Sequence, residues 1–177
     1  MFREFRLDVQ RYEFPWFRVA LMPQIWAIFW YRLGHWLYKE NKLRVLAIFR
    51  VPYLLVYTFF EAFLQMRLDP CADIGPGLLI GHSGGVHLHP DVVIGDHCDI
   101  AHHVTIGASA GGREGVPRIG NRVYIGTGAT LIGKITVGDG ARIAANTLVI
   151  TSVPPGATVM GVPGRVVTAP QTAGGAP

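Results

Sequence analysis

His82 has the sequence surroundings expected of a histidine that takes part in chemistry. It follows Gly81 and precedes Ser83-Gly84-Gly85, so its small neighbours leave the imidazole accessible. A neutral imidazole near pH 7 can accept the proton of a hydroxyl group as that hydroxyl attacks an electrophile. We therefore take His82 as the candidate general base.

The other histidines carry less information. His102 and His103 stand immediately before a β-type segment, and we expect them to face a subunit interface. We interpret His87, His89 and His97 as residues of the surface or of chain corners. The two cysteines, at 71 and 98, form neither a disulfide framework nor a metal-ligand spacing, and we expect small buried or turn residues there.

Composition limits the classes of protein to which the chain can belong. Half of the 177 residues are apolar and 16% are charged, which excludes a disordered chain. The formal net charge is +4, and most basic residues lie in the first 67 positions. This bias suits an anionic membrane surface or polyanionic ligand as well as a solvated helical face. No pattern in the second half suggests nucleic-acid binding.

The elements that position His82 follow from a short repeat, in which branched aliphatic residues recur every six positions. Three runs contain them: Ile74, Ile80, Val86; then Leu88, Ile94, Ile100, Ile106; then Ile119, Ile125, Leu131, Val137, Ile143, Val149. This period fits a triangular coil of short parallel strands, whose inward aliphatic residues stack along the axis. The thirteen positions correspond to a little over four coils.

The repeat changes phase at two places. It slips by two between Val86 and Leu88, just after His82, and breaks between Ile106 and Ile119. We expect the additional residues 108–118 to bulge out as a loop, and loops on a rigid scaffold often carry function. Drift in a tolerant solenoid is the alternative explanation.

The first part of the chain is aromatic and has a helical pattern. The segments 24–40 and 43–67 are apolar nearly all round, but charged residues and Pro52 interrupt them. We expect helices that pack against a partner subunit or lie on a membrane surface, not membrane spans. The sequence thus predicts a helical region over 1–68, a mainly β left-handed parallel β-helix over 69–167, and a disordered tail over 168–177.

The ordered motifs in this β region resemble the hexapeptide-repeat acyltransferases, especially the serine acetyltransferases and the exopolysaccharide (colanic-acid type) acetyltransferases. The resemblance covers about residues 67–167. The motifs that carry it are Ile80-Gly81-His82-Ser83-Gly84-Gly85, Val104-Thr105-Ile106-Gly107, Ile125-Gly126-Thr127-Gly128-Ala129, Val153-Pro154-Pro155-Gly156 and Gly161-Val162-Pro163-Gly164-Arg165.

The resemblance implies a homotrimer that uses acetyl-CoA, with active sites between neighbouring subunits. It places His82 at the family's catalytic histidine. It also implies that Gly107, Thr127 and Ala145 hold the pantetheine arm of the coenzyme, and that Arg142 and Arg165 lie near its phosphates. Direct transfer needs no acyl-enzyme, so we expect neither a cysteine nucleophile nor a metal.

The chain departs from the serine acetyltransferase pattern at charged positions. Arg67 stands where that family carries the aspartate that orients the catalytic histidine, Gly81 replaces an aspartate, and Gly115-Val116 replaces an arginine-histidine pair before Pro117. Asp69 and Asp73 are the nearest carboxylates to take the orienting role. Since a zwitterion needs charged partners, we expect the acceptor to be a sugar hydroxyl of an exopolysaccharide or its precursor. Serine O-acetylation in cysteine biosynthesis is the alternative.

Two further readings remain open at this point. Left-handed β-helices also host carbonic anhydrases with three zinc-bound histidines, but the histidine spacings here do not match that family. A non-catalytic scaffold is the other reading. The chain opens without a signal-peptide pattern, so we expect a cytoplasmic protein that contacts the membrane, if at all, peripherally through its N-terminal helices.

Overall fold

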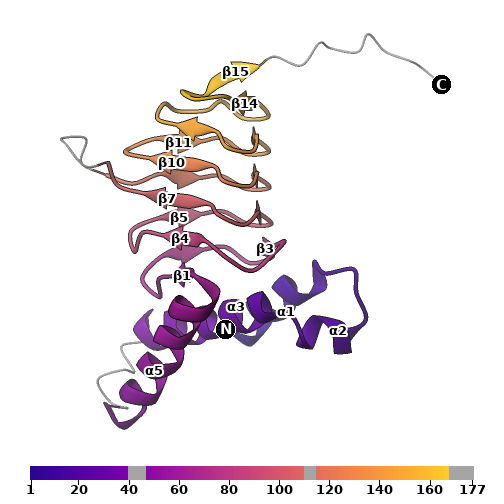
Figure 1. Ribbon diagram of the computed structural model, residues 1–177, viewed down its shortest axis with the longest axis vertical. Helices are drawn as coiled ribbons and strands as arrows, with labels where there is room; N and C mark the ends of the chain where they lie inside the picture. Colours follow the sequence, from indigo (N-terminus) through magenta and orange to yellow (C-terminus); the bar gives the residue numbers. More distant parts are fainter. Residues whose placement is uncertain (40–46, 110–114, 168–177) are drawn as a thin grey trace.

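The computed structural model describes residues 1–39, 47–109 and 115–167, which form a parallel β-solenoid standing on a group of helices (Figure 1). The tail 168–177 that we expected to be disordered lies outside the described residues, as does part of the loop expected over 108–118. The prediction of a mainly β solenoid with a helical N-terminal region is confirmed.

Three parallel sheets form the walls of the solenoid. Sheet A contains β1 (Met66–Leu68), β4 (Val86–Leu88), β7 (Thr105–Gly107), β10 (Thr130–Ile132) and β13 (Leu148–Val149). Sheet B contains β2 (Asp73–Ile74), β5 (Val93–Ile94), β8 (Arg118–Ile119) and β11 (Thr136–Val137). Sheet C contains β3 (Leu79–Ile80), β6 (Asp99–Ile100), β9 (Tyr124–Ile125), β12 (Arg142–Ile143), β14 (Thr158–Met160) and β15 (Arg165–Val167). Only β15 is antiparallel to its neighbour in these described sheets.

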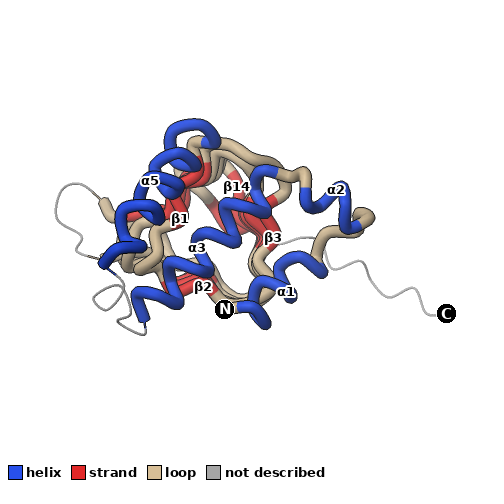
Figure 2. The backbone as a smooth tube through the Cα atoms, turned by 90° about the horizontal axis from the view of Figure 1, so that it is seen from below, coloured by secondary structure: helices blue, strands red, loops and turns tan. Residues whose placement is uncertain are grey.

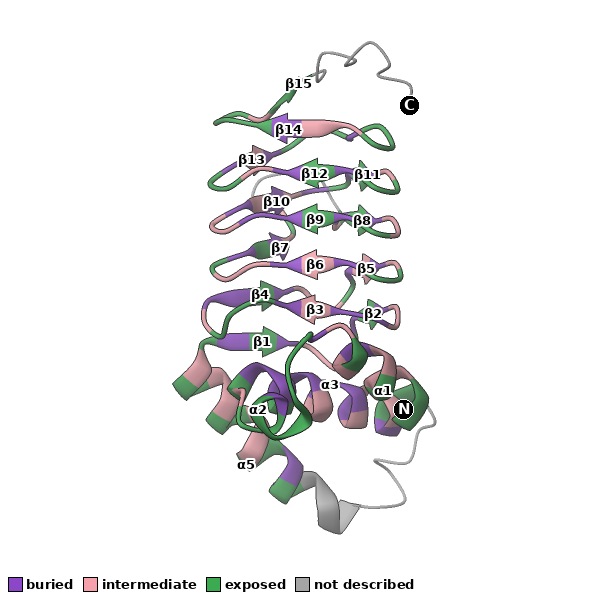
Figure 3. Ribbon diagram, turned by 90° about the vertical axis from the view of Figure 1, so that its right-hand side faces the viewer, coloured by how far each residue is buried: buried purple, intermediate pink, exposed green. Residues whose placement is uncertain are grey.

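The six-residue repeat forms the core of the solenoid. From β1 to β14, one aliphatic residue of each strand is almost fully buried in the core, and Figure 3 shows buried segments in the coils of the stack. The register matches inward residues of successive coils, for example Ile80 with Ile100 and Ile100 with Ile125. Parallel pairing between coils therefore stacks the apolar side chains in columns, and burial of these columns drives folding.

The first phase break marks the turn that carries His82. Val86 and Leu88 both point inward from the same strand, β4, so the additional residues lie in the turn between β3 and β4. Gly84 and Gly85 in this turn have φ values of 115° and 66°. Side chains with a Cβ rarely adopt such angles, so the two glycines allow a wider turn without disturbing the stack.

Four described helices precede or adjoin the solenoid: α1 (Phe2–Gln10), α2 (Trp16–Ala20), α3 (Pro23–Lys39) and α5 (Ala47–Leu64). Figure 2 shows α3 lying across the lower end of the solenoid. The first strand, β1, lies inside the range 1–68 that we expected to be helical, because Met66 pairs with Val86 in sheet A. No described helix combines the length and the apolarity needed to cross a membrane.

Buried polar contacts join the helices to the first coil. The Arg32 guanidinium and the Asp8 carboxylate are 1% and 0% exposed and lie 2.8 Å apart. Arg32 also donates to the carbonyls of Ile74 and Gly75, and Asp8 accepts a hydrogen bond from the Leu78 amide. The basic residues of the N-terminal region therefore do not all lie on a solvated face, because Arg32 is buried against the first coil of the solenoid.

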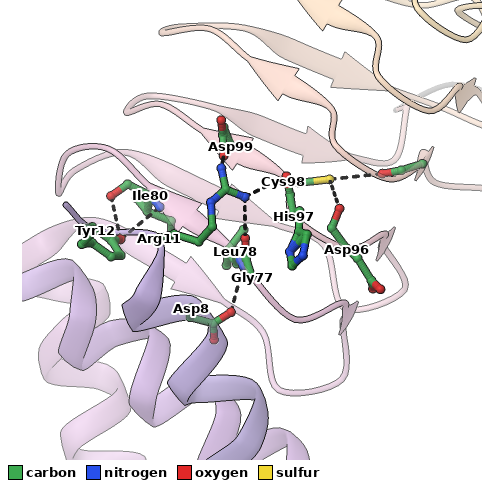
Figure 4. A network of polar contacts seen from close by, with 11 residues as sticks. Asp8, Arg11, Tyr12, Gly77, Leu78, Ile80, Asp96, His97, Cys98 and Asp99 are labelled. Carbon is green, nitrogen blue, oxygen red and sulfur yellow. Dashed lines mark hydrogen bonds and ion pairs between the residues drawn. The ribbon is translucent and has the colours of Figure 1, made fainter.

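A second set of contacts reaches one coil higher (Figure 4). Arg11 forms an ion pair with Asp99 and donates to the carbonyls of Gly77 and His97. The Tyr12 hydroxyl donates to the Ile80 carbonyl, and burial is the main cause that raises the pKa of Tyr12 to about 12. These contacts fix α1 against sheet C just before the turn that carries His82.

Candidate active site

His82 lies at the edge where sheet C passes into sheet A, and its side chain is exposed. The strand registers of sheet C extend into this edge, so that His82, His102, Thr127 and Ala145 occupy equivalent positions in successive coils. We call this column of four residues the histidine edge. The histidine edge thus contains the predicted base, His82, and two of the residues expected to hold pantetheine, Thr127 and Ala145.

His102 is the nearest aromatic neighbour of His82. The ring centroids are 5.6 Å apart and the rings meet edge to face. His102 Nδ1 is buried and has no hydrogen-bond partner among the residues that the structure describes. His103 follows with a centroid 5.2 Å from that of His102, at an exposed position. His103 thus adds a third imidazole beside the two at the lower end of the histidine edge.

Gly107 lies at a different edge. The registers Leu68 with Leu88 and Leu88 with Ile106 place Asp69, His89 and Gly107 in one column where sheet A passes toward sheet B. We call this column the glycine edge. The proposed pantetheine residues are therefore divided between two edges of the same solenoid.

Neither candidate orienting carboxylate contacts His82 within the described chain. Asp69 is at the glycine edge, where it accepts a hydrogen bond from the Cys71 amide at 2.9 Å. Asp73 is exposed on β2 of sheet B. Arg67, which stands where the resemblance expects an aspartate, is half exposed on β1. The structure thus separates His82 from both predicted partners.

Arg142 and Arg165 lie on sheet C, toward the upper end of the solenoid. The Arg142 guanidinium carbon is 4.9 Å from the centroid of the Tyr124 ring, one strand below it. This contact holds the cation over an aromatic face. Arg165 is exposed on β15 and pairs with Met160. Both arginines are accessible to an anionic ligand.

The two cysteines differ in accessibility. Cys98 is buried, and desolvation is the main cause that raises the pKa of its thiol to about 11. Cys71 is exposed in a turn, and its pKa is raised mainly by desolvation. A raised pKa keeps a thiol protonated at neutral pH, whereas a nucleophilic cysteine needs its thiolate. Neither cysteine is therefore suited to act as a nucleophile, and His82 remains the candidate catalytic residue.

Comparison with known proteins extends the sequence resemblance. The family model described as "Bacterial transferase hexapeptide (six repeats)" matches residues 117–151. Together with the parallel solenoid, this match indicates a protein of the hexapeptide-repeat class.

The curated relatives are more specific. The chain is 37% identical over 163 residues to a serine acetyltransferase of Helicobacter pylori strain J99, with 86% of each chain covered. It is 37% identical over 157 residues to the serine acetyltransferase of Mycobacterium tuberculosis H37Rv, covering 88% of this chain and 65% of that protein. The chain belongs to the serine acetyltransferase family. It spans less than two thirds of the length of the mycobacterial relative.

Solved structures agree with this membership. A Brucella abortus serine acetyltransferase in complex with coenzyme A has a TM-score of 0.79 at 32% identity, covering 93% of this chain and 66% of that one. A soybean serine acetyltransferase complexed with serine has a TM-score of 0.80 at 30% identity, covering 93% of this chain and 68% of that one.

These findings correct our expectation of an exopolysaccharide or sugar acceptor and of a role in polysaccharide biosynthesis. The matching relatives and structures are serine acetyltransferases, which was the alternative reading. The sequence argument weighed only the charged residues that are missing at single positions. The strand register also brings together side chains that are distant in the sequence, such as Arg67 and His87 on the outward face of sheet A.

Proposed function

We propose that this protein transfers the acetyl group of acetyl-CoA to the hydroxyl of L-serine, with His82 as the general base. The match to serine acetyltransferases over 93% of the chain, including a coenzyme A complex and a serine complex, carries the proposal. The exposed imidazole of His82 at the foot of the histidine edge supplies the base that this chemistry needs.

In the proposed step, His82 takes the proton of the serine hydroxyl as its oxygen attacks the thioester carbonyl. A C–O bond forms, the carbonyl oxygen gains negative charge, and a backbone amide at the edge stabilises that charge. The C–S bond then breaks, and the imidazolium returns its proton to the leaving thiolate of coenzyme A. No covalent acyl-enzyme is needed, which suits the burial of Cys98 and the raised pKa of its thiol.

We further propose that the active site forms between subunits of a homotrimer. Thr127 and Ala145 lie on the histidine edge and Gly107 lies on the glycine edge, and a junction between the edges of two neighbouring subunits would bring all three against one ligand. In that arrangement Asp69 of the neighbouring subunit is better placed than Asp73 to orient the His82 ring. Arg142 and Arg165, on the exposed upper part of sheet C, would bind coenzyme phosphates.

The test measures the release of the coenzyme A thiol from acetyl-CoA with L-serine as acceptor, and identifies O-acetylserine by mass spectrometry. We expect serine-dependent turnover by the wild type and loss of at least about 100-fold in His82→Asn. His97→Asn is the matched control, because His97 is exposed at φ 57°, an angle that Asn tolerates. A wild-type protein that does not acetylate serine would refute the proposal.

A further inference from the structure

A groove of about 420 Å³ lies on the outward face of sheet A. Arg67 on β1, His87 on β4 and Thr105 on β7 are aligned by the strand register, so their outward side chains follow one another across the sheet. His89 and Gly107 close the groove at the glycine edge. We call this the sheet A groove.

The side chains that line the sheet A groove are suited to an anion. Arg67 supplies a permanent positive charge, His87 and His89 supply imidazoles, and Thr105 supplies a hydroxyl. No lining residue of this described groove is acidic. A wall that combines positive charge with hydrogen-bond donors attracts and binds negatively charged groups.

The nearby carboxylates leave the Arg67 guanidinium largely available. Glu61 approaches Arg67 only to 3.7 Å, and both side chains are substantially exposed. Burial is the main cause that raises the pKa of Tyr57 to about 12, and the Arg67 cation acts in the opposite direction. Asp91 approaches His89 to 3.7 Å from an exposed position. A guanidinium carries several N–H donors in a fork, more than one long contact uses.

We propose that the sheet A groove binds the carboxylate of the acceptor amino acid and that Arg67 is its specificity-determining residue. This inference rests on the proposed function and deepens it. A carboxylate presents two oxygens in a plane, which matches the planar fork of a guanidinium. The groove adjoins the glycine edge, which the proposed assembly places opposite His82 of the neighbouring subunit. Arg67 then supplies the positive charge that the acceptor carboxylate requires.

A phosphate group of coenzyme A is the other anion that a groove of this chemistry would bind. The two sources predict different kinetic effects, because the acceptor and the coenzyme are varied independently. Loss of a carboxylate site raises the KM for serine, whereas loss of a phosphate site raises the KM for acetyl-CoA.

The experiment compares Arg67→Gln with the wild-type protein. We expect the KM for L-serine to rise about 10- to 100-fold, which is the loss of one or more charge-assisted hydrogen bonds. The kcat and the KM for acetyl-CoA should change by less than about threefold. Arg6→Gln is the matched control, because Arg6 is an exposed arginine of α1 far from the groove in sequence, and it should leave all three constants unchanged.

L-Serinamide provides the second arm, since it keeps the hydroxyl and the ammonium but lacks the carboxylate. The wild type should prefer serine to serinamide by at least about tenfold in kcat/KM, and Arg67→Gln should lose most of that preference. An unchanged preference, or a rise confined to the KM for acetyl-CoA, would overturn the assignment.

Direct binding separates this inference from the proposed function. Calorimetric titration of L-serine and L-serinamide into the wild type and Arg67→Gln should show serine binding weakened by the variant. If the wild type turns over no serine, the proposed function fails. If the wild type binds serine no better than serinamide, or Arg67→Gln binds serine as the wild type does, the carboxylate site fails.

Discussion

The buried pair of Asp8 and Arg32 allows a quantitative prediction about what holds the helices to the solenoid. In Asp8→Ala, Arg32 loses its two bonds to the carboxylate, at 2.8 and 3.0 Å, and the Leu78 amide loses an acceptor at 2.8 Å. The guanidinium stays buried, and the hydrogen-bond acceptors that remain for it among the described residues are the two carbonyls of the first coil. Breaking a buried pair in this way costs about 3–5 kcal/mol. We therefore expect the free energy of unfolding to fall by that amount.

Equilibrium unfolding in urea, followed by far-UV circular dichroism at one fixed protein concentration, measures this change. Glu13→Ala is the control, since it also removes an acidic side chain from the N-terminal region but from an exposed position. We expect it to change stability by less than about 0.5 kcal/mol. The double variant Asp8→Leu/Arg32→Met removes both charges and should recover much of the loss. A loss below about 1 kcal/mol in Asp8→Ala would refute the reasoning.

Three other predictions concern the base, the core and the thiols. His82→Gln should lower kcat at least about 100-fold while the unfolding midpoint stays near that of the wild type, because the side chain is exposed; unchanged kcat would remove His82 from the mechanism. Ile125→Ala should cost about 2–5 kcal/mol in urea unfolding, since Ile125 is 0% exposed in the core. At pH 8, iodoacetamide should label Cys71 and leave Cys98 unlabelled until denaturation, because the pKa of Cys98 is raised to about 11. Mass spectrometry of the native protein checks this, and rapid labelling of Cys98 would contradict it.

The solenoid could be predicted because its signal is repeated. Each coil places one aliphatic residue on each wall, so a residue such as Ile100 is supported by equivalents above and below it in the sequence pattern. The slip in the repeat after His82 corresponds to a wider turn at Gly84 and Gly85. Local periodicity determines these features, so they can be read from the sequence.

The contacts between helices and solenoid could not be predicted in the same way. Arg32 and Asp8 are 24 residues apart, and Arg11 and Asp99 are 88 apart. No period links these positions, so each arginine looked like any other basic residue of the N-terminal region. Only the packing of α3 across the first coil makes Arg32 a buried residue.

The candidate site was predictable only in part, for a related reason. A motif identifies His82, but the division of Gly107 and Thr127 between two edges depends on where each coil turns. The sheet A groove has no motif, because Arg67, His87 and Thr105 come from three different coils. The roughly regular spacing from Arg67 to His87 to Thr105, about one coil each, was the signal that could have found it.

Elements at both ends of the stack limit how further coils can add to it. A parallel coil exposes unpaired amides and carbonyls at its first and last turns, and such edges invite further strands to add. Here α3 lies across the first turn (Figure 2), and the antiparallel β15 covers the last strand of sheet C. The helices and β15 therefore disfavour end-to-end stacking at the first turn and at sheet C, which leaves the sides of the solenoid, where the two edges lie, as the surfaces for association.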